Sequence, residues 1–331
     1  MHFALSEDQI ALRDAVREML AAQCPPAVVR AAWPDGEKAA VDELWTALAQ
    51  MDVFGTAVPE EAGGLGLDET DLVPLLEEFG YAAVPLPAAE TAMVVTPLLA
   101  AVGDPRLPDV LSGATRVAVA GADGLVPYGD RSDLVLVLTD TQARLVTPEP
   151  GPTLATVDGS RALTRLPDTA GDPVTDDPEL VSTARLHVDL ATAAQLVGLG
   201  RRMLDLTVEY VGTRRQFGVP VGSFQAVKHH LANALLRTEF AAPVVQAAGW
   251  AVAQRRPNRA TDVSMAAVLA AEAAQEVARA AIQCHGAIGY TVEYDLHLYA
   301  KRTWALAANC DVDAHLDRLA GALDLNEEVA A

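Results

Sequence analysis

Two segments of the sequence combine arginine, glutamine, aromatic and glycine residues in a way that suits a phosphorylated ligand. The first covers residues 213–232, TRRQFGVPVGSFQAVKHHLA, and includes Arg214, Arg215 and Phe217, with Gln225 in the next expected helix. An arginine beside a helix junction can hold a phosphate through two parallel hydrogen bonds, and a phenylalanine ring offers a flat apolar surface. The second covers residues 283–302, QCHGAIGYTVEYDLHLYAKR, whose glycines would let a ligand approach the backbone amides closely. Spacing alone favours helix termination and core packing over a binding site in both segments.

Other groups of reactive residues lack the spacing that their chemistry needs. Asp311, Asp313 and His315 stand at alternate positions, so on a helix their side chains would point in different directions, and we expect no metal site. The glycines between positions 63 and 66 follow no strand, so they predict a turn and not a dinucleotide-binding loop. Gly198 lies inside an expected helix, where the missing side chain favours close helix packing.

The composition limits the classes of function that are open to the chain. It has 331 residues, with 24 lysines and arginines against 45 aspartates and glutamates, and a formal charge of −21. This acidic balance argues against sequence-independent binding to nucleic acid and against docking on an anionic membrane, since both need a basic field. Hydrophobic residues make up 51% of the chain, which excludes disorder for most of it.

The cysteines and the first residues predict a cytoplasmic protein. Three cysteines cannot form a disulfide framework, and their spacing does not fit a metal site. The opening stretch, MHFALSEDQIALRD, has no basic region followed by an apolar one, so we expect no signal peptide. No run approaches the roughly 20 apolar residues of a membrane-spanning helix, so we expect no membrane span.

Three parts of the chain must position the candidate residues. Residues 1–103 predict an N-terminal helical domain, in which Ser6 and Gln9 fit a capping box. Residues 104–189 predict a small β domain, because prolines interrupt short β-branched runs such as RVAVAG, DLVLVL and ARLHVDL. Residues 190–331 predict a four-helix bundle. Its long segments, rich in alanine, leucine and valine, are expected at 190–212, 222–255, 261–285 and 296–322.

The two arginine- and glycine-containing segments resemble the C-terminal signatures of the acyl-CoA dehydrogenases. A third motif, LWTALAQMDVFGTAVPEEAGGLGLDE at residues 44–69, resembles a helix and turn in the N-terminal half of that family. The three motifs stand in the family's order and span most of the chain. The resemblance implies a mainly α fold with an N-terminal helical domain, a middle β domain and a C-terminal four-helix bundle. It also implies a flavoenzyme that desaturates an acyl-CoA thioester between the α and β carbons.

The resemblance further implies which residues meet flavin adenine dinucleotide (FAD) at a subunit interface. In the family, the β domain of one subunit holds the isoalloxazine ring, while the bundle of a neighbour meets the phosphates and the adenosine. The positions that match these bundle contacts are Arg214, Gln216, Phe217, Gln283, Gly286 and Ala287. Ala287 stands where the family usually has a second glycine, and it adds a methyl group where the backbone meets the dinucleotide.

The family's catalytic base has no matching glutamate in this chain. The reaction needs a carboxylate that removes the α proton while a hydride passes to the flavin. Counted from Tyr290, the base position falls on Cys310, and a thiol with an ordinary pKa of about 8.5 is a poor substitute. Asp311 is adjacent but turned by roughly 100° on a helix. The family's alternative base position falls near Val188, with Asp189 beside it, so Asp311 and Asp189 are only weak candidates.

The β domain is shorter than the resemblance would require. Between residues 114 and 140 the chain resembles the later part of the family's β domain, and the earlier strands that touch flavin and substrate have no match. We therefore expect the smaller, non-catalytic subunit of a heteromeric acyl-CoA dehydrogenase of the steroid-degrading type. A longer catalytic subunit would be its partner, acyl-CoA the substrate, and an electron-transfer protein the acceptor that the complex uses.

Two alternatives remain open from the sequence. The chain could be a self-sufficient flavoenzyme that uses Asp189, Asp311 or Asp313 as its base. It could also be a flavin-free scaffold or assembly subunit, in which the matching motifs only pack.

Overall fold

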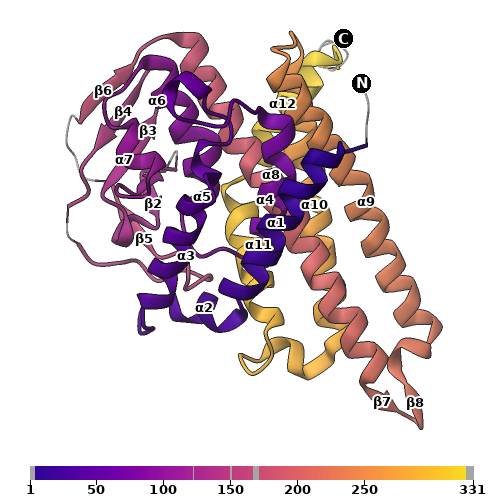
Figure 1. The fold of residues 1–331 in the computed structure, drawn as a ribbon. Coiled ribbons are helices and arrows are strands. Elements are labelled where there is room, and N and C mark those ends of the chain that lie inside the picture. Colours follow the sequence, from indigo (N-terminus) through magenta and orange to yellow (C-terminus); the bar gives the residue numbers. More distant parts are fainter. Residues whose placement is uncertain (1–3, 122, 150, 167–170, 326–331) are drawn as a thin grey trace.

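The protein is described from a computed structural model, which places residues 4–121, 123–149, 151–166 and 171–325. Short helices from the N-terminal part lie in the middle of the molecule, with small sheets on one side and long helices on the other (Figure 1). This arrangement confirms the expected mainly α fold with a small β domain. Within the described residues, no helix is both long and apolar enough to cross a membrane.

The N-terminal part is helical, as the sequence predicts. Ser6 and Gln9 form the expected capping box at the start of its first helix, and Asp68 caps a later one by accepting a hydrogen bond from the backbone N–H of Thr70. The elements are α1 (Glu7–Gln23), α2 (Pro26–Ala31), α3 (Ala39–Gln50), η1 (Val53–Gly55), η2 (Glu60–Ala62), α4 (Glu69–Ala82), α5 (Ala88–Glu90), η3 (Thr91–Val95), α6 (Thr96–Val102) and α7 (Leu107–Leu111).

The glycine-rich stretch between η2 and α4 is a turn, as predicted. Gly63 and Gly66 adopt φ angles of 90° and 67°, a left-handed conformation that side chains disfavour. A Cβ atom on Gly64 would overlap the carbonyl oxygen of Val58. The glycines are therefore needed to shape the chain between two helices, and no phosphate site has to be invoked for them.

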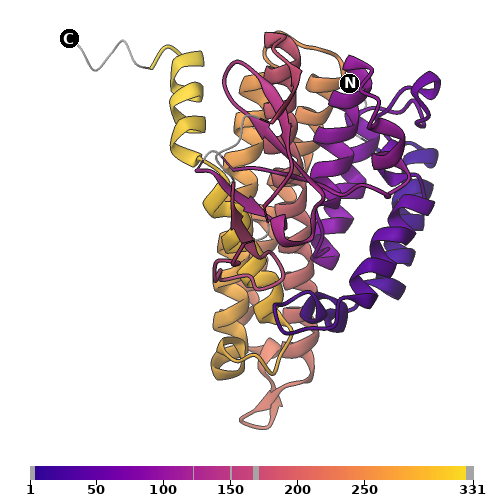
Figure 2. The same ribbon diagram turned by 90° about the vertical axis from the view of Figure 1, so that its left-hand side faces the viewer.

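The middle part forms two small sheets. β1 (Val117–Val119) pairs in parallel with β3 (Leu134–Leu138), so that Ala118 lies opposite Val135. β4 (Ala143–Val146) continues this sheet antiparallel to β3, and β6 (Asp172–Thr175) forms its far edge. A second sheet pairs β2 (Leu125–Pro127) with β5 (Leu163–Arg165), and the short helix η4 (Gly129–Arg131) follows β2. Figure 2 shows these strands lying across one flank of the helices.

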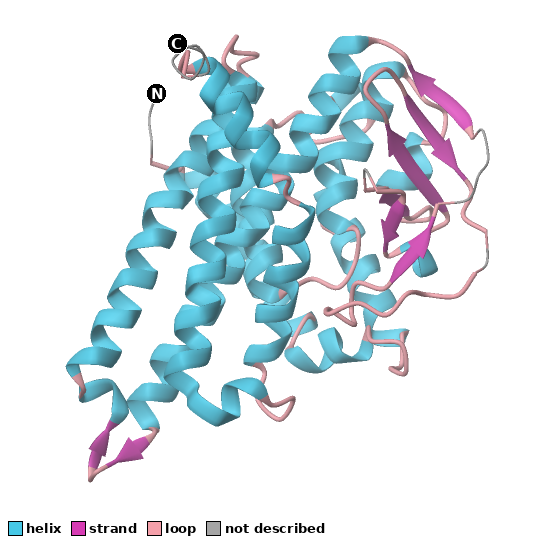
Figure 3. Ribbon diagram, turned by 180° about the vertical axis from the view of Figure 1, so that it is seen from behind, coloured by secondary structure: helices cyan, strands magenta, loops and turns pink. Residues whose placement is uncertain are grey.

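Long helices form the C-terminal bundle. They are α8 (Pro178–Thr213), α9 (Gln225–Ala253), α10 (Arg259–His285) and α11 (Leu296–Asn309), followed by the shorter α12 (Val312–Ala322). The connection between α8 and α9 contains the hairpin strands β7 (Arg215–Gln216) and β8 (Val219–Pro220) and the turn η5 (Val221–Ser223), and η6 (Gly286–Tyr290) follows α10. Seen from behind, the β7–β8 hairpin projects from one end of the bundle, and the sheets lie on the opposite side (Figure 3).

Two local predictions were wrong. The run ARLHVDL, predicted as a strand, lies inside α8, which begins at Pro178 and so includes the expected domain boundary at 189. Alternating Leu186, Val188 and Leu190 imitate a strand, but Asp177 caps the helix and Pro178 occupies its first position, which proline tolerates. The expected helix at 296–322 is interrupted at Cys310, where the backbone is extended.

The helices α4 and α8 cross at very short range. A Cβ atom on Gly80 of α4 would overlap the carbonyl oxygen of Gln195, and one on Gly198 of α8 would overlap that of Glu77. The predicted role of Gly198 in close helix packing is therefore confirmed. Buried apolar residues of the N-terminal helices, the bundle and one face of the larger sheet belong to one hydrophobic core that passes through this crossing. The other face of that sheet contributes Ala118, Val135, Val137 and Val146 to a second, smaller cluster.

Candidate functional site

The two segments singled out in the sequence lie at the same end of the bundle. α8 and α10 run in the same direction, so the hairpin after α8 and the turn after α10 come together (Figure 1). Tyr210 near the end of α8 stacks on His285 at the end of α10, with ring centroids 4.3 Å apart. Tyr294 packs against both rings, at 5.7 Å from Tyr210 and 4.9 Å from His285. This aromatic cluster fixes the two segments relative to each other.

The tip of the hairpin holds an aromatic residue in a strained conformation. Phe217 and Gly218 have φ angles of 50° and 81°, which is the geometry of a type I′ turn between β7 and β8. Glycine adopts this conformation freely, but a phenylalanine is held there at a cost of about 1–3 kcal/mol. The Phe217 ring is 94% exposed, and its aromatic neighbour is Phe224, 6.3 Å away. An exposed ring in a strained turn is suited to contact with another molecule.

The remaining candidate residues lie at the same end of the bundle and are exposed. Arg214 follows the last turn of α8, and its guanidinium makes no hydrogen bond or ion pair with any residue that the structure describes. Gln283 and Ala287 are exposed beside it along the second segment. Gly286 has φ 64° and ψ −139°, a region open essentially to glycine alone. The structure thus brings the six candidate residues to one exposed end, which we call the bundle tip.

His285 is a polar residue at the bundle tip that the sequence analysis did not single out. Its Nδ1 lies 2.8 Å from the carbonyl oxygen of Ala281, so this nitrogen carries the proton and donates it. Its Nε2 is buried without a hydrogen-bond partner among the described residues. Burial lowers the pKa of His285, an effect that the bond to Ala281 partly opposes. The imidazole is therefore neutral, and its Nε2 is a hydrogen-bond acceptor beside Gly286. The only signal for His285 in the sequence was its position in the QCHG motif.

The base position implied by the resemblance is closed to solvent. Cys310 is 8% exposed, and its Sγ lies 3.8 Å from the carbonyl oxygen of Ala267. Burial, together with the nearby carboxylates of Asp189 and Asp311, raises the pKa of Cys310 to about 11. The thiol is therefore protonated at neutral pH and is a poor proton acceptor.

The two weak candidates for a base have other partners. Asp311 caps α12 by accepting a hydrogen bond from the backbone N–H of Ala314 at 3.1 Å. Asp189 Oδ1 lies 3.8 Å from His315 Nε2, and burial raises the pKa of Asp189 while His315 lowers it. His315 in turn contacts Ser264 Oγ at 3.0 Å. Both carboxylates therefore belong to the attachment of α12 to the bundle, and the third, Asp313, is exposed.

A network of buried charged groups lies on α11 and reaches Asn309, the residue before Cys310. Arg302 of α11 is 1% exposed and forms an ion pair with Asp158, which is 2% exposed. Arg302 also donates to Ser160 Oγ and to the carbonyl oxygen of Val84, each at 2.8 Å. In the amide orientation that satisfies both groups, Asn309 accepts hydrogen bonds from Arg161 at 3.1 and 3.2 Å.

Glu90 completes this network from the N-terminal helices. Burial raises the pKa of its carboxyl group, while Arg161 and Arg302 lower it. One carboxyl oxygen of Glu90 has no hydrogen-bond partner within the described part of the chain. The segment around residues 158–161 therefore joins α11 to the N-terminal helices through buried charged groups, and Arg161 reaches Asn309.

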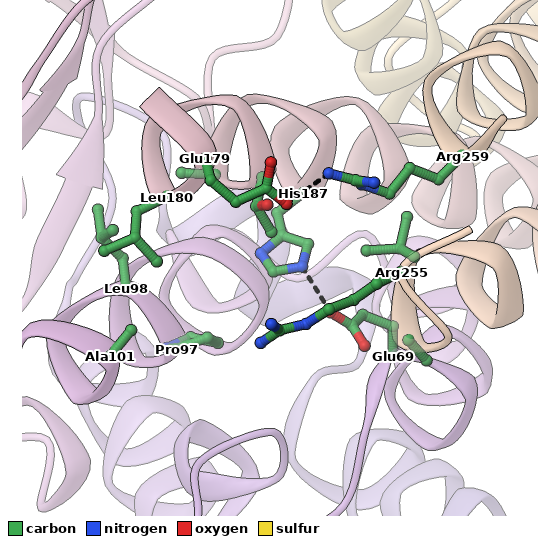
Figure 4. Close-up of a pocket in the computed structure, with 13 residues that line it drawn as sticks. Glu69, Pro97, Leu98, Ala101, Glu179, Leu180, His187, Arg255 and Arg259 are labelled. Atoms are coloured by element: carbon green, nitrogen blue, oxygen red, sulfur yellow. Dashed lines mark hydrogen bonds and ion pairs between the residues drawn. The ribbon is translucent and has the colours of Figure 1, made fainter. Parts of the chain in front are cut away.

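A cavity of about 250 Å³ lies elsewhere, near the start of α8. Figure 4 shows His187 facing Glu69 of α4, with their side chains 2.7 Å apart, and Glu179 paired with Arg259 across the mouth. Leu98, Leu180 and Val252 are among its apolar lining residues. Neither Cys310 nor any bundle-tip residue lines it, so it is separate from the sites above.

The Glu69–His187 pair is expected to make the stability of the protein depend on pH in the acid range. Burial raises the pKa of Glu69, but the hydrogen bond and charge of His187, together with a backbone hydrogen bond and the charge of Arg255, hold that pKa below the usual value of 4.5. Because the pKa of Glu69 is lower in the folded than in the unfolded protein, its ionised form stabilises the folded state at pH values above the unfolded-state pKa. This stabilisation is lost as the pH falls through the folded-state pKa. His187→Gln is expected to lower the free energy of unfolding by about 1.5–3 kcal/mol at pH 6, and the deficit is expected to narrow towards pH 3.

Urea unfolding between pH 3 and pH 7 measures this effect, with His229→Gln, an exposed histidine on α9, as the control. A deficit of the same size at every pH would contradict the assignment of the effect to Glu69.

Comparison with known proteins identifies the family. The acyl-CoA dehydrogenase N-terminal domain matches residues 6–108, and the acyl-CoA dehydrogenase C-terminal domain matches residues 182–307. The acyl-CoA dehydrogenase IpdE2 of Mycobacterium tuberculosis is 35% identical over 299 residues, which cover 89% of this chain and 91% of that protein. FadE34 of the same organism is 33% identical over 90% of this chain and 45% of its own length.

Solved structures agree with the sequence matches. The crystal structure of the ChsE4–ChsE5 complex from Mycobacterium tuberculosis superposes with a TM-score of 0.82 at 26% identity, covering 98% of this chain and 99% of that chain. A variant of the Tcur3481–Tcur3483 steroid ACAD gives a TM-score of 0.83 at 27% identity with the same coverage. The matched regions include both sides of the bundle tip and the N-terminal helices. The chain belongs to the acyl-CoA dehydrogenase family.

Proposed function

We propose that this chain is the non-catalytic subunit of a heteromeric acyl-CoA dehydrogenase and completes the FAD site of a longer catalytic partner. The complex would desaturate an acyl-CoA thioester between its α and β carbons and pass the electrons to an electron-transfer protein. One observation carries the proposal: Arg214, Gln216 and Gln283 at the bundle tip are exposed, whereas the base position at Cys310 is buried and its thiol is protonated. The exposed tip is suited to lend residues to another subunit's site, and the buried thiol is not suited to take a proton from a substrate.

The residues at the bundle tip fit a dinucleotide. The Arg214 guanidinium would neutralise phosphate charge, and the side chains of Gln216 and Gln283 offer amide donors and acceptors. Phe217 would cover an apolar surface, and Gly286 and Ala287 leave the backbone accessible. The Nε2 of His285, which is buried without a hydrogen-bond partner among the described residues, would accept a further hydrogen bond. When bound, FAD supplies the acceptor for the hydride that leaves the acyl chain.

Two observations support a longer catalytic partner: the relatives, and the catalytic base and first β strands for which this chain has no match. Two structural neighbours, the ChsE4–ChsE5 complex and the Tcur3481–Tcur3483 steroid ACAD, are each named for two chains. A catalytic partner would contribute the carboxylate base and the first strands of the β domain, which this chain does not match. The name of the second neighbour supports a steroid-derived acyl group for the complex proposed here.

The test compares the chain expressed alone with the chain expressed beside a longer acyl-CoA dehydrogenase subunit. We expect little flavin in the first preparation and about one FAD per pair of chains in the second, measured by absorbance at 450 nm after gel filtration. Acyl-CoA is expected to bleach the flavin of the complex only. Cys310→Ala, measured in the complex, is expected to leave the turnover rate within about twofold of the original, since a protonated thiol is a poor base.

Two other results would replace the proposal. Flavin-dependent turnover by the chain alone, lost in Asp189→Asn, would make the protein a self-sufficient enzyme with a different base. Colourless preparations with every partner would make it a flavin-free scaffold.

A further inference from the structure

The cavity near the start of α8 lies at the opposite end of the bundle from the bundle tip. It encloses about 250 Å³, and its apolar lining includes Leu98, Leu180 and Val252. An apolar cavity of about 150 Å³ can hold benzene, so this one has room for a larger organic molecule. The FAD site proposed above uses none of the residues that line it.

Three long helices begin at this cavity. Glu69 opens α4, Glu179 lies in the first turn of α8, and Arg259 opens α10. The start of a helix carries a partial positive charge, which favours an anion. One helix, α9, ends there, but carbonyl oxygens of its last turn already accept hydrogen bonds from the backbone N–H groups of Arg255 and Arg256, at 2.9 Å each. The helix ends around the cavity therefore favour a negatively charged ligand group.

Arg255 places a cation at the cavity in spite of its backbone conformation. Its φ angle is 47°, in the left-handed region, at a position after a helix that glycine commonly occupies because a side chain costs energy there. Within the described part of the chain its guanidinium makes no hydrogen bond and no ion pair. Figure 4 shows the side chain reaching across the cavity towards Pro97. The chain therefore keeps an unpaired cation here although glycine would fit the backbone better.

His187 adds a polar atom to the cavity wall. The residue is 5% exposed, and its Nε2 lies 2.7 Å from Glu69 Oε1. Because a carboxylate only accepts, Nε2 carries the proton of that bond. The other ring nitrogen, Nδ1, has no hydrogen-bond partner among the residues that the structure describes, and in Figure 4 it lies on the side of the ring towards Leu98. A proton on Nδ1 would let the ring donate to an anion in the cavity.

We propose that this cavity binds a free monocarboxylic acid with an apolar body. The carboxylate would pair with the Arg255 guanidinium through two hydrogen bonds, and the apolar body would lie against Leu98 and Leu180. Glu69 and Glu179 carry negative charge at the same cavity, so a head group with one charge is favoured over a phosphate with two. The site does not depend on FAD, on the longer partner or on the proposed function.

Calorimetric titration of the full chain with octanoate at pH 7 tests the proposal. We expect saturable binding of about one octanoate per chain. 1-Octanol has the same apolar body without the charge, and it is expected to bind at least about tenfold more weakly because it loses the charge-assisted hydrogen bonds. Acetate has the charge without the body, and it is expected to give no saturable heat over the same concentrations.

Arg255→Gly removes the cation and is expected to weaken octanoate binding by about tenfold or more. Glycine adopts a positive φ freely, so the variant is expected to keep the circular dichroism spectrum and the urea midpoint of the original chain. Arg256→Ala is the matched control. Arg256 is exposed, and its guanidinium lies over the Trp250 ring and not in the cavity lining, so octanoate binding is expected to be unchanged.

Two further variants test whether octanoate lies in this cavity. Ala101 is an exposed lining residue, so Ala101→Phe is expected to fold, to occupy part of the cavity and to weaken octanoate binding by about tenfold or more. Glu179→Gln removes a carboxylate from the cavity and releases Arg259 from its ion pair. It is expected to tighten octanoate binding by about threefold or more.

The proposal would be overturned by the absence of saturable octanoate binding or by equally tight binding of 1-octanol. An unchanged affinity in Arg255→Gly, Ala101→Phe or Glu179→Gln, or an equal loss in Arg256→Ala, would also overturn it. Displacement of octanoate by octanoyl-CoA would assign the cavity to a thioester instead of a free acid, with the same consequence. Flavin content with the longer partner tests the proposed function separately, and Arg255→Gly is expected to leave that content unchanged.

Discussion

Replacing Arg302 with methionine is expected to lower the free energy of unfolding by about 3–5 kcal/mol. The substitution leaves the Asp158 carboxylate buried without its cation, and it removes donors from Ser160 and from the carbonyl oxygen of Val84. A charge that is buried and uncompensated is far more costly than the loss of the pair as a whole. Urea unfolding followed by circular dichroism at pH 7 measures the change.

Two further variants make the result specific to the buried network. Arg185→Met removes an arginine whose ion pair with Asp140 is largely exposed, and it is expected to cost only about 0–1 kcal/mol. Asp158→Leu combined with Arg302→Met removes both charges, and it is expected to be more stable than Arg302→Met alone. If Arg302→Met lowered the free energy of unfolding no more than Arg185→Met does, the Arg302–Asp158 pair would not be desolvated as described.

Replacing Arg214 with alanine is expected to weaken FAD retention by the proposed complex by about tenfold to a hundredfold. A charge-assisted hydrogen bond to phosphate contributes about 1.5–3 kcal/mol, which corresponds to that range of dissociation constants. The guanidinium is exposed and has no partner within the described residues, so its removal is not expected to disturb the fold. Dialysis followed by titration with FAD, read by flavin absorbance, measures the dissociation constant.

The control for Arg214 lies on the same helix. Arg185→Ala removes the same charge near the start of α8, far from the bundle tip, and is expected to leave FAD retention unchanged. An unchanged dissociation constant in Arg214→Ala, or an equal loss in both variants, would remove Arg214 from the cofactor site.

Local sequence signals predicted most of the fold. The Ser6 capping box, the glycine turn before α4 and the runs that became β1 and β3 all depend on residues close together in the chain. The prediction was wrong for ARLHVDL because alternating apolar residues can also lie on a helix that is buried on more than one side. The long pattern at 296–322 concealed the break at Cys310, which no proline or glycine marks.

The residues of the candidate site could be predicted only in part, because only some of its features depend on neighbouring residues in the chain. The motifs at 213–232 and 283–302 are local, so their residues could be named before the structure was known. Their closeness depends on Tyr210 and His285, which come from different helices and meet only in the folded bundle. The ion pair of Asp158 with Arg302 joins residues 144 positions apart, and no pattern in either segment indicates it.

The glycine crossing of α4 and α8 has a consequence for how the chain can change. At Gly80 and Gly198 the two helices meet main chain to main chain, so no exchange of side chains can relieve a shift between them. The small strands, in contrast, meet the helices through apolar side chains that can be traded for others of similar volume. We therefore expect deletions and insertions to be tolerated in the sheets but not at this crossing. Without the N-terminal helices, the bundle would lose the close backbone contact that α4 makes with α8.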